Sequence, residues 1–188
     1  MRKKYRVTGI VQDGQLSIFT FKLIQMKRML MILLIMAVAQ TIMAQDCDNL
    51  VADLKKGTLN GVKPTANQAA IKEKLPCFTG DSEEGGPFNC GGGVFFLKHD
   101  FFCYTGGDYI EFRKNFNGKL SVPVLGLSQA EAVKKLGLGK VVREQKDGER
   151  TFVFLKTRYG CLVLTLVADA VTKVGMYAKP AKAVKLCL

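Results

Sequence analysis

The chain has 188 residues, of which 28 are basic and 16 acidic, and its formal net charge is +12. The basic residues are spread along the sequence and accompany no nucleic-acid-binding motif. The charge therefore indicates a solvated basic surface. Without a motif beside it, the charge does not point to a nucleic-acid-binding protein.

Residues 1–44 are predicted to precede the folded domain. Met26-Lys27-Arg28 is a basic start, Met29 to Ala39 is apolar and uncharged, and Ile42-Met43-Ala44 ends in a small residue, which is typical of a secretory signal. We expect translation to begin at Met26, with an unusually long basic region as the alternative, and cleavage to follow Ala44. The mature chain would be periplasmic or secreted, and the apolar run is too short to leave a stable membrane span.

Removal of this segment takes away seven basic residues and one acidic residue, which lowers the net charge to +6. All six cysteines remain: Cys47, Cys77, Cys90, Cys103, Cys161 and Cys187. An even number of cysteines in an exported chain predicts disulfides, with 15 possible connectivities if all of them pair. No CxxC motif occurs, so the sequence favours neither a zinc ribbon nor a thioredoxin-like redox pair.

Residues 45–60 are predicted to form an N-terminal helical arm. Asp46 or Asp48 can cap the helix, and Gly57 is a suitable end. The apolar residues Leu50, Val51 and Leu54 would then lie on one face of it. We expect this arm to pack across one end of the remaining chain.

Residues 61–121 and 122–188 are predicted to be two copies of one supersecondary unit. Phe96–Cys103 and Phe154–Cys161 both read FLKxxxxC, and each follows a short helical segment at a similar distance.

The helix of each unit has its own start and stop signals. Thr65–Gln68 and Ser128–Glu131 have the form of capping boxes. Pro76 and Gly137 end the two helices, because proline cannot continue a helix and glycine readily adopts the left-handed conformation after one.

The helices are followed by short runs of apolar and β-branched residues separated by turn signals, among them Gly106-Gly107 and Asp147-Gly148. The predicted strands are Val94–Lys98, Phe101–Thr105, Asp108–Lys114, Val141–Arg143, Arg150–Thr157, Cys161–Ala168 and Val171–Ala178. The fold class is therefore α+β, a tandem repeat of a helix and an antiparallel meander of three to four strands, with the helices on one face of the sheet.

The glycine-rich segment 76–93 is predicted to be a loop. Cys77 and Cys90 lie near its two ends, and a disulfide between them would close the loop and stabilise it by about 3 kcal/mol. Its acids Asp81, Glu83 and Glu84 are interpreted as a solvated loop or as contacts to a partner. A calcium or catalytic site is disfavoured because no histidine lies nearby.

Alternate residues of the strands face opposite sides of the sheet. A mostly aliphatic set is expected to face the helices: Phe95, Leu97, Phe102, Tyr104, Val153 and Leu155. The opposite set, with Cys103 and Cys161, is aromatic and basic, as protein-binding surfaces are. The predicted partner-binding residues are Phe96, Lys98, Phe101, Tyr109, Arg113, Phe154, Lys156 and Tyr159. The alternative is that a second layer covers this face as core.

His99 is the only histidine of the chain, and Asp100 and Cys103 lie near it in the sequence. A Cys-His nucleophile would need a thiol of lowered pKa beside a positioned base. His99 instead falls at a predicted hairpin tip, and a strand cysteine of an exported protein is normally oxidised. We therefore predict a protein that is not an enzyme and that needs no metal or cofactor.

The repeated unit, with a small residue ending the helix as in Leu127-Ser128 to Leu136-Gly137, resembles the beta-lactamase-inhibitor-protein-like fold. Small outer-membrane assembly lipoproteins of the SmpA/OmlA type share that fold. The resemblance implies a non-catalytic exported protein whose sheet face and loops grip another protein, although this chain has no lipobox. Residues 122–132 alone resemble the opening of a PASTA domain, which is a cell-wall-binding module.

The function expected from the sequence is an exported protein-binding module, an inhibitor or immunity-type protein acting on an exported enzyme or toxin. The alternative is an envelope scaffold or adaptor that binds the cell wall or outer-membrane machinery. In both cases the partner is not a nucleic acid.

Overall fold

The structure is a computed structural model that describes residues 47–83 and 91–186. All of these belong to one compact unit spanning residues 45–188. The predicted signal segment, Glu84, Cys90 and Cys187 lie outside the described residues. Within the described ranges, the helices are too short or too polar to cross a lipid bilayer.

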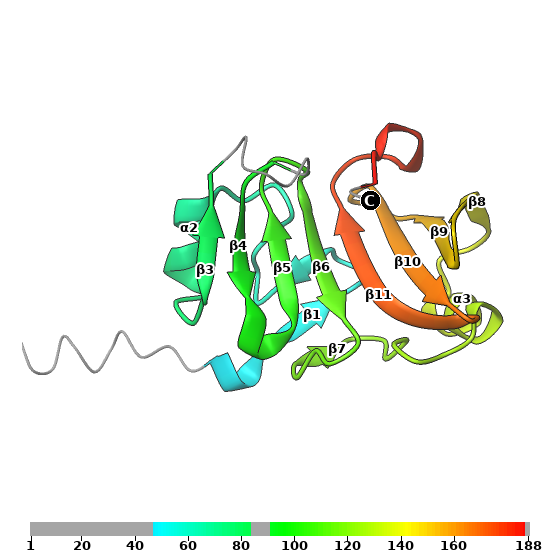
Figure 1. Cartoon of the computed structure of the whole chain (residues 1–188), viewed down its shortest axis with the longest axis horizontal. Coiled ribbons are helices and arrows are strands. Elements are labelled where there is room, and N and C mark those ends of the chain that lie inside the picture. Colours follow the sequence, from blue (N-terminus) through cyan, green and yellow to red (C-terminus); the bar gives the residue numbers. More distant parts are fainter. Residues whose placement is uncertain (1–46, 84–90, 187–188) are drawn as a thin grey trace, which may run out of the picture. The chain divides into compact units, whose positions relative to one another are not determined.

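The main element is an eight-stranded sheet of order β3-β4-β5-β6-β11-β10-β9-β8, in which every pairing is antiparallel (Figure 1). Its strands are β3 (Gly80–Ser82), β4 (Gly93–Phe96), β5 (Phe101–Tyr104), β6 (Tyr109–Arg113), β8 (Val141–Asp147), β9 (Arg150–Lys156), β10 (Cys161–Val167) and β11 (Ala170–Tyr177). Consecutive strands pair within each half, and β6 pairs with β11 to join the halves. The predicted α+β class with an antiparallel sheet is confirmed.

Two short helices accompany the sheet, and their ends are set by local hydrogen bonds. In α3 (Gln129–Leu136) the Ser128 hydroxyl accepts the Glu131 amide and the Glu131 carboxylate accepts the Ser128 amide, which confirms this capping box. Gly137 ends α3 in the left-handed conformation, with φ 62°. In α2 (Gln68–Lys74) the cap is Asn67, whose side chain accepts the Ala70 amide at 2.9 Å. The capping box predicted from Thr65 is therefore wrong.

The predicted N-terminal helix is also wrong. After the single 3-10 turn η1 (Cys47–Asn49) the chain forms β1 (Val51–Asp53). This strand is central in a small mixed sheet with β2 (Thr58–Leu59) and β7 (Lys119–Leu120). Leu50, Ala52 and Leu54 are buried, whereas Val51 is 46% exposed. This alternation has the period of a strand, so burial of every second residue decides the conformation.

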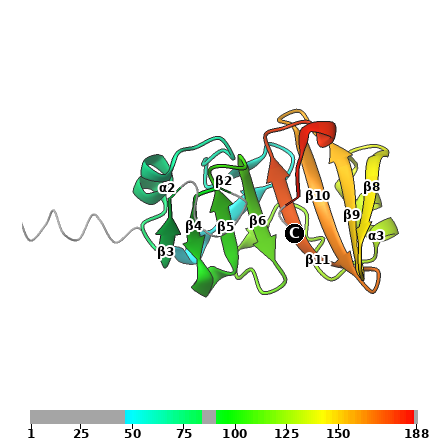
Figure 2. The ribbon, with the colours of Figure 1, turned by 45° about the horizontal axis from the view of Figure 1, so that its top comes forward.

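The main core lies between the small sheet with the two helices and one face of the eight-stranded sheet (Figure 2). Ile71 and Leu75 from the α2 region and Ala132 and Leu136 from α3 enter this core. The sheet contributes residues that are neighbours in register across the strands: Val94, Phe96, Phe101, Cys103, Ile110, Phe112, Val174, Met176, Leu162, Leu164, Val153 and Leu155. Both helices therefore pack against the same core.

A second cluster covers the other face of the sheet near its middle and β9–β10. It consists of Tyr109, Phe152, Phe154, Cys161, Val163, Tyr177 and Val184. Ala181 from the 3-10 turn η3 (Ala181–Ala183) and Leu186 pack against it. The part of this face near β9 and β10 is therefore covered by the chain's own C-terminal segment.

The predicted equivalence of the two FLKxxxxC segments is wrong. Leu155 lies inside β9 and is fully buried, whereas Leu97 begins the 3-10 turn η2 (Leu97–His99) and is 62% exposed. Because β4 ends at Phe96, Phe96 belongs to the main core, while the aligned Phe154 belongs to the cluster on the other face. Cys103 and Cys161 are separated in the same way, so the predicted inward and outward faces are exchanged in β4 and β5.

Four of the aromatic residues predicted to contact a partner are instead interior. Phe96, Phe101 and Phe154 are fully buried, and Tyr109 is 3% exposed. Phe96 stacks on Phe101 with ring centroids 4.1 Å apart, and Tyr109 stacks on Tyr177 at 4.4 Å. For these side chains the alternative that the sequence left open is correct, because they are covered and form part of the core.

Cys77 is bonded to Cys47, with a Cα–Cα distance of 6.0 Å. This pairing replaces the predicted Cys77–Cys90 bond. It links η1 to the segment after α2 across a separation of 30 residues. In the chain-entropy account, a loop of this length stabilises the folded state by about 3 to 4 kcal/mol.

The burial of Phe96 gives a test of the face assignment. Phe96→Ala should lower the free energy of unfolding by about 3 to 5 kcal/mol, because it leaves a cavity in the main core. The neighbouring Leu97→Ala should change it by less than about 1 kcal/mol, because Leu97 is mostly exposed. Urea denaturation of both variants measures the difference, and equal losses would contradict the assignment.

Candidate binding site

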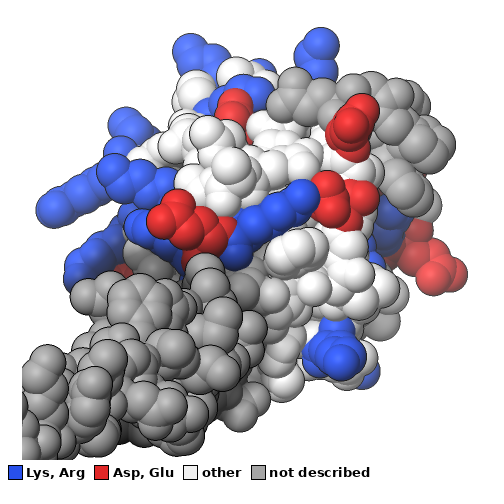
Figure 3. Space-filling view, turned by 90° about the vertical axis from the view of Figure 1, so that its left-hand side faces the viewer, with Lys and Arg blue, Asp and Glu red and all other residues white. Residues whose placement is uncertain are grey.

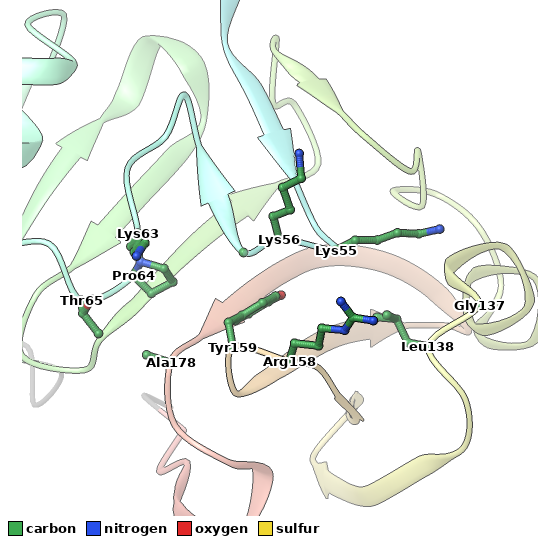
Figure 4. Close-up of a pocket in the computed structure, with 11 residues that line it drawn as sticks. Lys55, Lys56, Lys63, Pro64, Thr65, Gly137, Leu138, Arg158, Tyr159 and Ala178 are labelled. Atoms are coloured by element: carbon green, nitrogen blue, oxygen red, sulfur yellow. The ribbon is translucent and has the colours of Figure 1, made fainter.

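Two adjoining hollows lie on either side of the turn between β9 and β10. The first has a volume of about 700 Å³ and is lined by Lys55, Lys56, Gly57, Lys63, Pro64, Thr65, Gly137, Leu138, Arg158, Tyr159 and Ala178 (Figure 4). The second has a volume of about 850 Å³ and is lined by Val142, Arg143, Glu144, Lys156, Thr157, Arg158, Tyr159, Gly160, Pro180, Ala181 and Lys182. Arg158 and Tyr159 are common to both, and we call the pair the basic hollows.

The turn between β1 and β2 forms one wall of the first hollow. The Asp53 carboxylate accepts the backbone amides of Lys56 at 3.0 Å and of Lys55 at 3.1 Å. The bond from the Lys56 amide is the main reason why the pKa of Asp53 is lowered. The carboxylate therefore fixes the turn, and the side chains of Lys55 and Lys56 are exposed to solvent (Figure 4).

Tyr159 is the centre of the first hollow. Its hydroxyl donates a hydrogen bond to the Leu54 carbonyl at 3.1 Å, and its ring lies against Gly57 so closely that a Cβ on Gly57 would overlap it. Burial raises the pKa of Tyr159, which is therefore a neutral donor at physiological pH. The aromatic ring, Pro64, Leu138 and Ala178 make the floor apolar, with the basic side chains at the rim (Figure 4).

Arg143 builds the wall of the second hollow by holding the C-terminal segment. Its Nη1 donates to the carbonyls of Ala181 at 3.0 Å and of Val184 at 3.1 Å. Its guanidinium also lies 4.5 Å from the ring centroid of Phe154. Arg143 is therefore a structural residue of the site, and the other cations are those available to a ligand.

The basic hollows combine seven basic residues with one acid, Glu144. Among the described residues, only Lys56 of these seven has a carboxylate within 4.0 Å, namely Asp53 at 3.5 Å. Lys55, Lys63, Lys156, Arg158 and Lys182 are exposed. Like charges gathered around an apolar floor favour an anionic ligand that also carries apolar groups.

Of the residues predicted to bind a partner, Lys156 and Tyr159 line the basic hollows. Lys98 is exposed on η2, apart from them in the sequence and absent from their lining. Arg113 pairs with Glu111 at 2.7 Å and lies 3.9 Å from the ring centroid of Phe102, so its guanidinium is already engaged within the chain.

The predicted acidic loop is only partly described. Asp81 lies on β3 and pairs with Lys72 of α2 at 2.7 Å, and Glu83 is exposed. Viewed from the α2 side, the described surface carries both basic and acidic side chains (Figure 3). The basic hollows differ from it in having one acid, Glu144, among seven basic residues.

The Cys-His nucleophile that the sequence analysis considered and disfavoured would need the Cys103 thiol to be deprotonated beside His99. Cys103 is 1% exposed, and burial raises the pKa of its thiol. Burial also raises the pKa of the Cys161 thiol to about 12. Both thiols are therefore protonated at neutral pH, whereas His99 lies near Cys47 and Cys77.

Sequence reasoning did not identify Lys55, Lys56, Lys63, Arg158 and Lys182 as members of a site. They come from four separate segments of the chain, and the segments share no recognisable motif. The only available signal was the pair Lys55-Lys56 before Gly57. In the sequence this pattern is equally typical of the end of a helix.

The comparisons with protein-family models, with curated proteins and with solved structures give no match to this chain.

The contact between Gly57 and Tyr159 can be tested with a matched pair of substitutions. Gly57 and Gly61 both have positive φ, 70° and 78°, so alanine at either position costs about 1 to 2 kcal/mol in backbone strain. Only at Gly57 would the new Cβ meet the Tyr159 ring, because nothing lies within 4 Å at Gly61. Urea denaturation should show a larger loss for Gly57→Ala, with a shift of the Tyr159 ring signals in NMR spectra. Equal losses and unchanged signals would contradict the contact.

The raised pKa of Cys161 predicts a pH dependence of stability. Above about pH 8.5 the unfolded chain loses its thiol protons while the folded protein retains that of Cys161 up to about pH 12. The folded state then binds more protons, so the free energy of unfolding falls as the pH rises, by about 1 kcal/mol for this thiol between pH 8 and 9.5. Urea titrations should show a smaller fall in Cys161→Ala, and an identical fall would contradict the assignment.

Proposed function

We propose that the chain is an exported, non-catalytic protein-binding module, an inhibitor or immunity-type protein that acts on an exported enzyme or toxin. The single observation that carries the binding function is the pair of basic hollows. They would receive an acidic segment of the partner protein.

Two properties of the hollows support a protein ligand. Exposed lysines and arginines that lack ion pairs attract acidic groups over distances of about 8 to 10 Å and accelerate encounter. The Tyr159 ring, with Arg158 beside it, offers the combination of aromatic and guanidinium groups found in the energetically important parts of interfaces. An acidic segment with an apolar side chain would satisfy the rim and the floor together.

The organisation of the sheet supports the proposal of a tandem unit. Each half contributes one helix followed by four strands in meander order, and the last strands of the two halves, β6 and β11, are paired. A duplicated unit would produce this arrangement. The residues that correspond between the two halves would then not be those paired by the two FLKxxxxC segments. It is also the arrangement that the resemblance to the beta-lactamase-inhibitor-protein-like fold implies.

Export and the absence of catalysis are proposed on separate grounds. Export to the periplasm or beyond the cell is supported by the signal-like segment 26–44 and by the disulfide between Cys47 and Cys77. A non-catalytic role is supported by the two described free thiols, Cys103 and Cys161, which are buried and protonated.

The binding function can be tested with a charge reversal and a matched control. The double variant Lys156→Glu/Arg158→Glu should bind an acidic partner at least about tenfold more weakly, because attraction at the rim becomes repulsion. Lys114→Glu is the control. Lys114 is exposed and follows Arg113. Arg113 and its register partner Lys173 are at the opposite end of the β6–β11 pairing from Tyr177, which precedes Ala178 of the first hollow.

The measurement is NMR titration of the full chain with a glutamate-rich peptide and with its glutamine counterpart. Shifts around the β9–β10 turn that need glutamate, weaken with salt and disappear in the double variant support the proposal. The partner captured from an envelope extract should then depend on the same residues. Shifts elsewhere, or capture that survives the charge reversal, would contradict it, and binding to sedimented cell wall alone would favour an envelope adaptor.

A further inference from the structure

Three side chains with metal-binding donor atoms converge at a place that does not belong to the lining of the basic hollows. A sulfur of Cys47, a sulfur of Cys77 and a ring nitrogen of His99 all lie within 4.8 Å of one another. They belong to η1, to the segment after α2 and to η2. This is the one group of three such donors among the described residues.

The imidazole of His99 is already oriented by a neighbouring side chain. Its Nδ1 lies 2.9 Å from Oδ1 of Asn117. An amide oxygen can only accept a hydrogen bond, so Nδ1 carries a proton, and in the neutral imidazole the lone pair is then on Nε2. Histidines that bind metals commonly donate their other ring N–H to such a partner, which fixes the tautomer and the ring.

In the structure the two sulfurs are joined as a disulfide, and in this state they cannot act as thiolate ligands. A dithiol reductant would change this by supplying two electrons and two protons. The S–S bond then breaks, Cys47 and Cys77 become thiols, and the reductant becomes a disulfide. The segments that carry Cys47 and Cys77 place both sulfurs beside His99 in the disulfide-bonded structure.

We propose that the reduced protein binds one Zn²⁺ ion through the sulfurs of Cys47 and Cys77 and Nε2 of His99. Binding releases the two thiol protons, and the fourth coordination position is left to water or to another ligand. Oxidation of the two thiolates by a disulfide oxidant expels the ion and restores the Cys47–Cys77 bond. The site therefore exchanges a metal for a disulfide, independently of the basic hollows.

The required movement is small. Zn–S bonds of about 2.3 Å at tetrahedral angles place two sulfur ligands about 3.8 Å apart, and a nitrogen ligand lies slightly closer. After reduction the sulfurs separate to that distance, and the ring nitrogen of His99, which now lies within 4.8 Å of both sulfurs, approaches them by up to about 1.2 Å. Two thiolates and an imidazole form a ligand set that suits zinc, whereas calcium and magnesium prefer oxygen ligands.

The other described thiols do not compete for this role. Cys103 and Cys161 are buried on opposite faces of the sheet, and burial raises the pKa of both. A metal prefers sulfur that is readily deprotonated, so these two positions disfavour binding.

The test is a titration of the full-length chain with Co²⁺ under anaerobic conditions, after reduction with a phosphine, followed by displacement with Zn²⁺. The reduced protein should bind one Co²⁺ with the charge-transfer absorption of thiolate ligands, and Zn²⁺ should remove that absorption. The oxidised protein should bind at least 100-fold more weakly. Equal binding by the reduced and oxidised proteins would overturn the proposal.

Three variants assign the ligands. Cys47→Ser/Cys77→Ser keeps the other four cysteines and should lose the thiolate absorption. Its control is the reduced parent protein, because neither protein has the Cys47–Cys77 disulfide. His99→Ala and Asn117→Ala should each weaken Zn²⁺ binding by about 10- to 100-fold. Circular dichroism checks that the variants are folded. Retained binding in the double cysteine variant, or unchanged affinity in His99→Ala, would refute the site.

Discussion

The pairing of β6 with β11 is the interaction on which the rest of the structure depends. It joins two meanders of four strands into one sheet through five residue pairs, from Arg113 with Lys173 to Tyr109 with Tyr177. Ile110 and Phe112 on β6 and Val174 and Met176 on β11 point into the same core. The hydrophobic core is thus shared by both halves, and its burial supplies the main favourable free energy of the fold.

The basic hollows exist because this core brings distant turns together. The hydroxyl of Tyr159 reaches the carbonyl of Leu54, 105 residues earlier in the chain. The ring then rests on Gly57, where any larger residue would displace it. Cations from the β1–β2 turn, the β9–β10 turn and the C-terminal segment therefore surround one aromatic ring, although no two of these segments are adjacent in sequence.

The aromatic residues of the second sheet face have a structural role. Tyr104, Tyr109 and Tyr177 stack with centroid separations of 4.4 Å, and Arg143 holds the C-terminal segment across Phe154. Large apolar rings in an exposed sheet face would promote association, and covering them removes that risk. The exposed charged side chains around the basic hollows, by contrast, remain in water.

Features that depend on a few neighbouring residues were determined by the sequence. The Ser128–Glu131 capping box, the end of α3 at Gly137 and the turn at Asp147-Gly148 were predicted because their hydrogen bonds and dihedral angles are set within about four residues. Alternation also showed which residues share a face within a single strand, but it grouped Phe101 with Tyr109, which lie on opposite faces of the sheet. It could not show which face is inward, because that depends on where β4 ends and on what packs against it.

The tertiary structure alone decided the burial of Phe96, the strand in place of an N-terminal helix, the partner of Cys77 and the gathering of cations around Tyr159. Each of these depends on contacts between segments far apart in the chain, and such contacts leave no periodic signal in either segment.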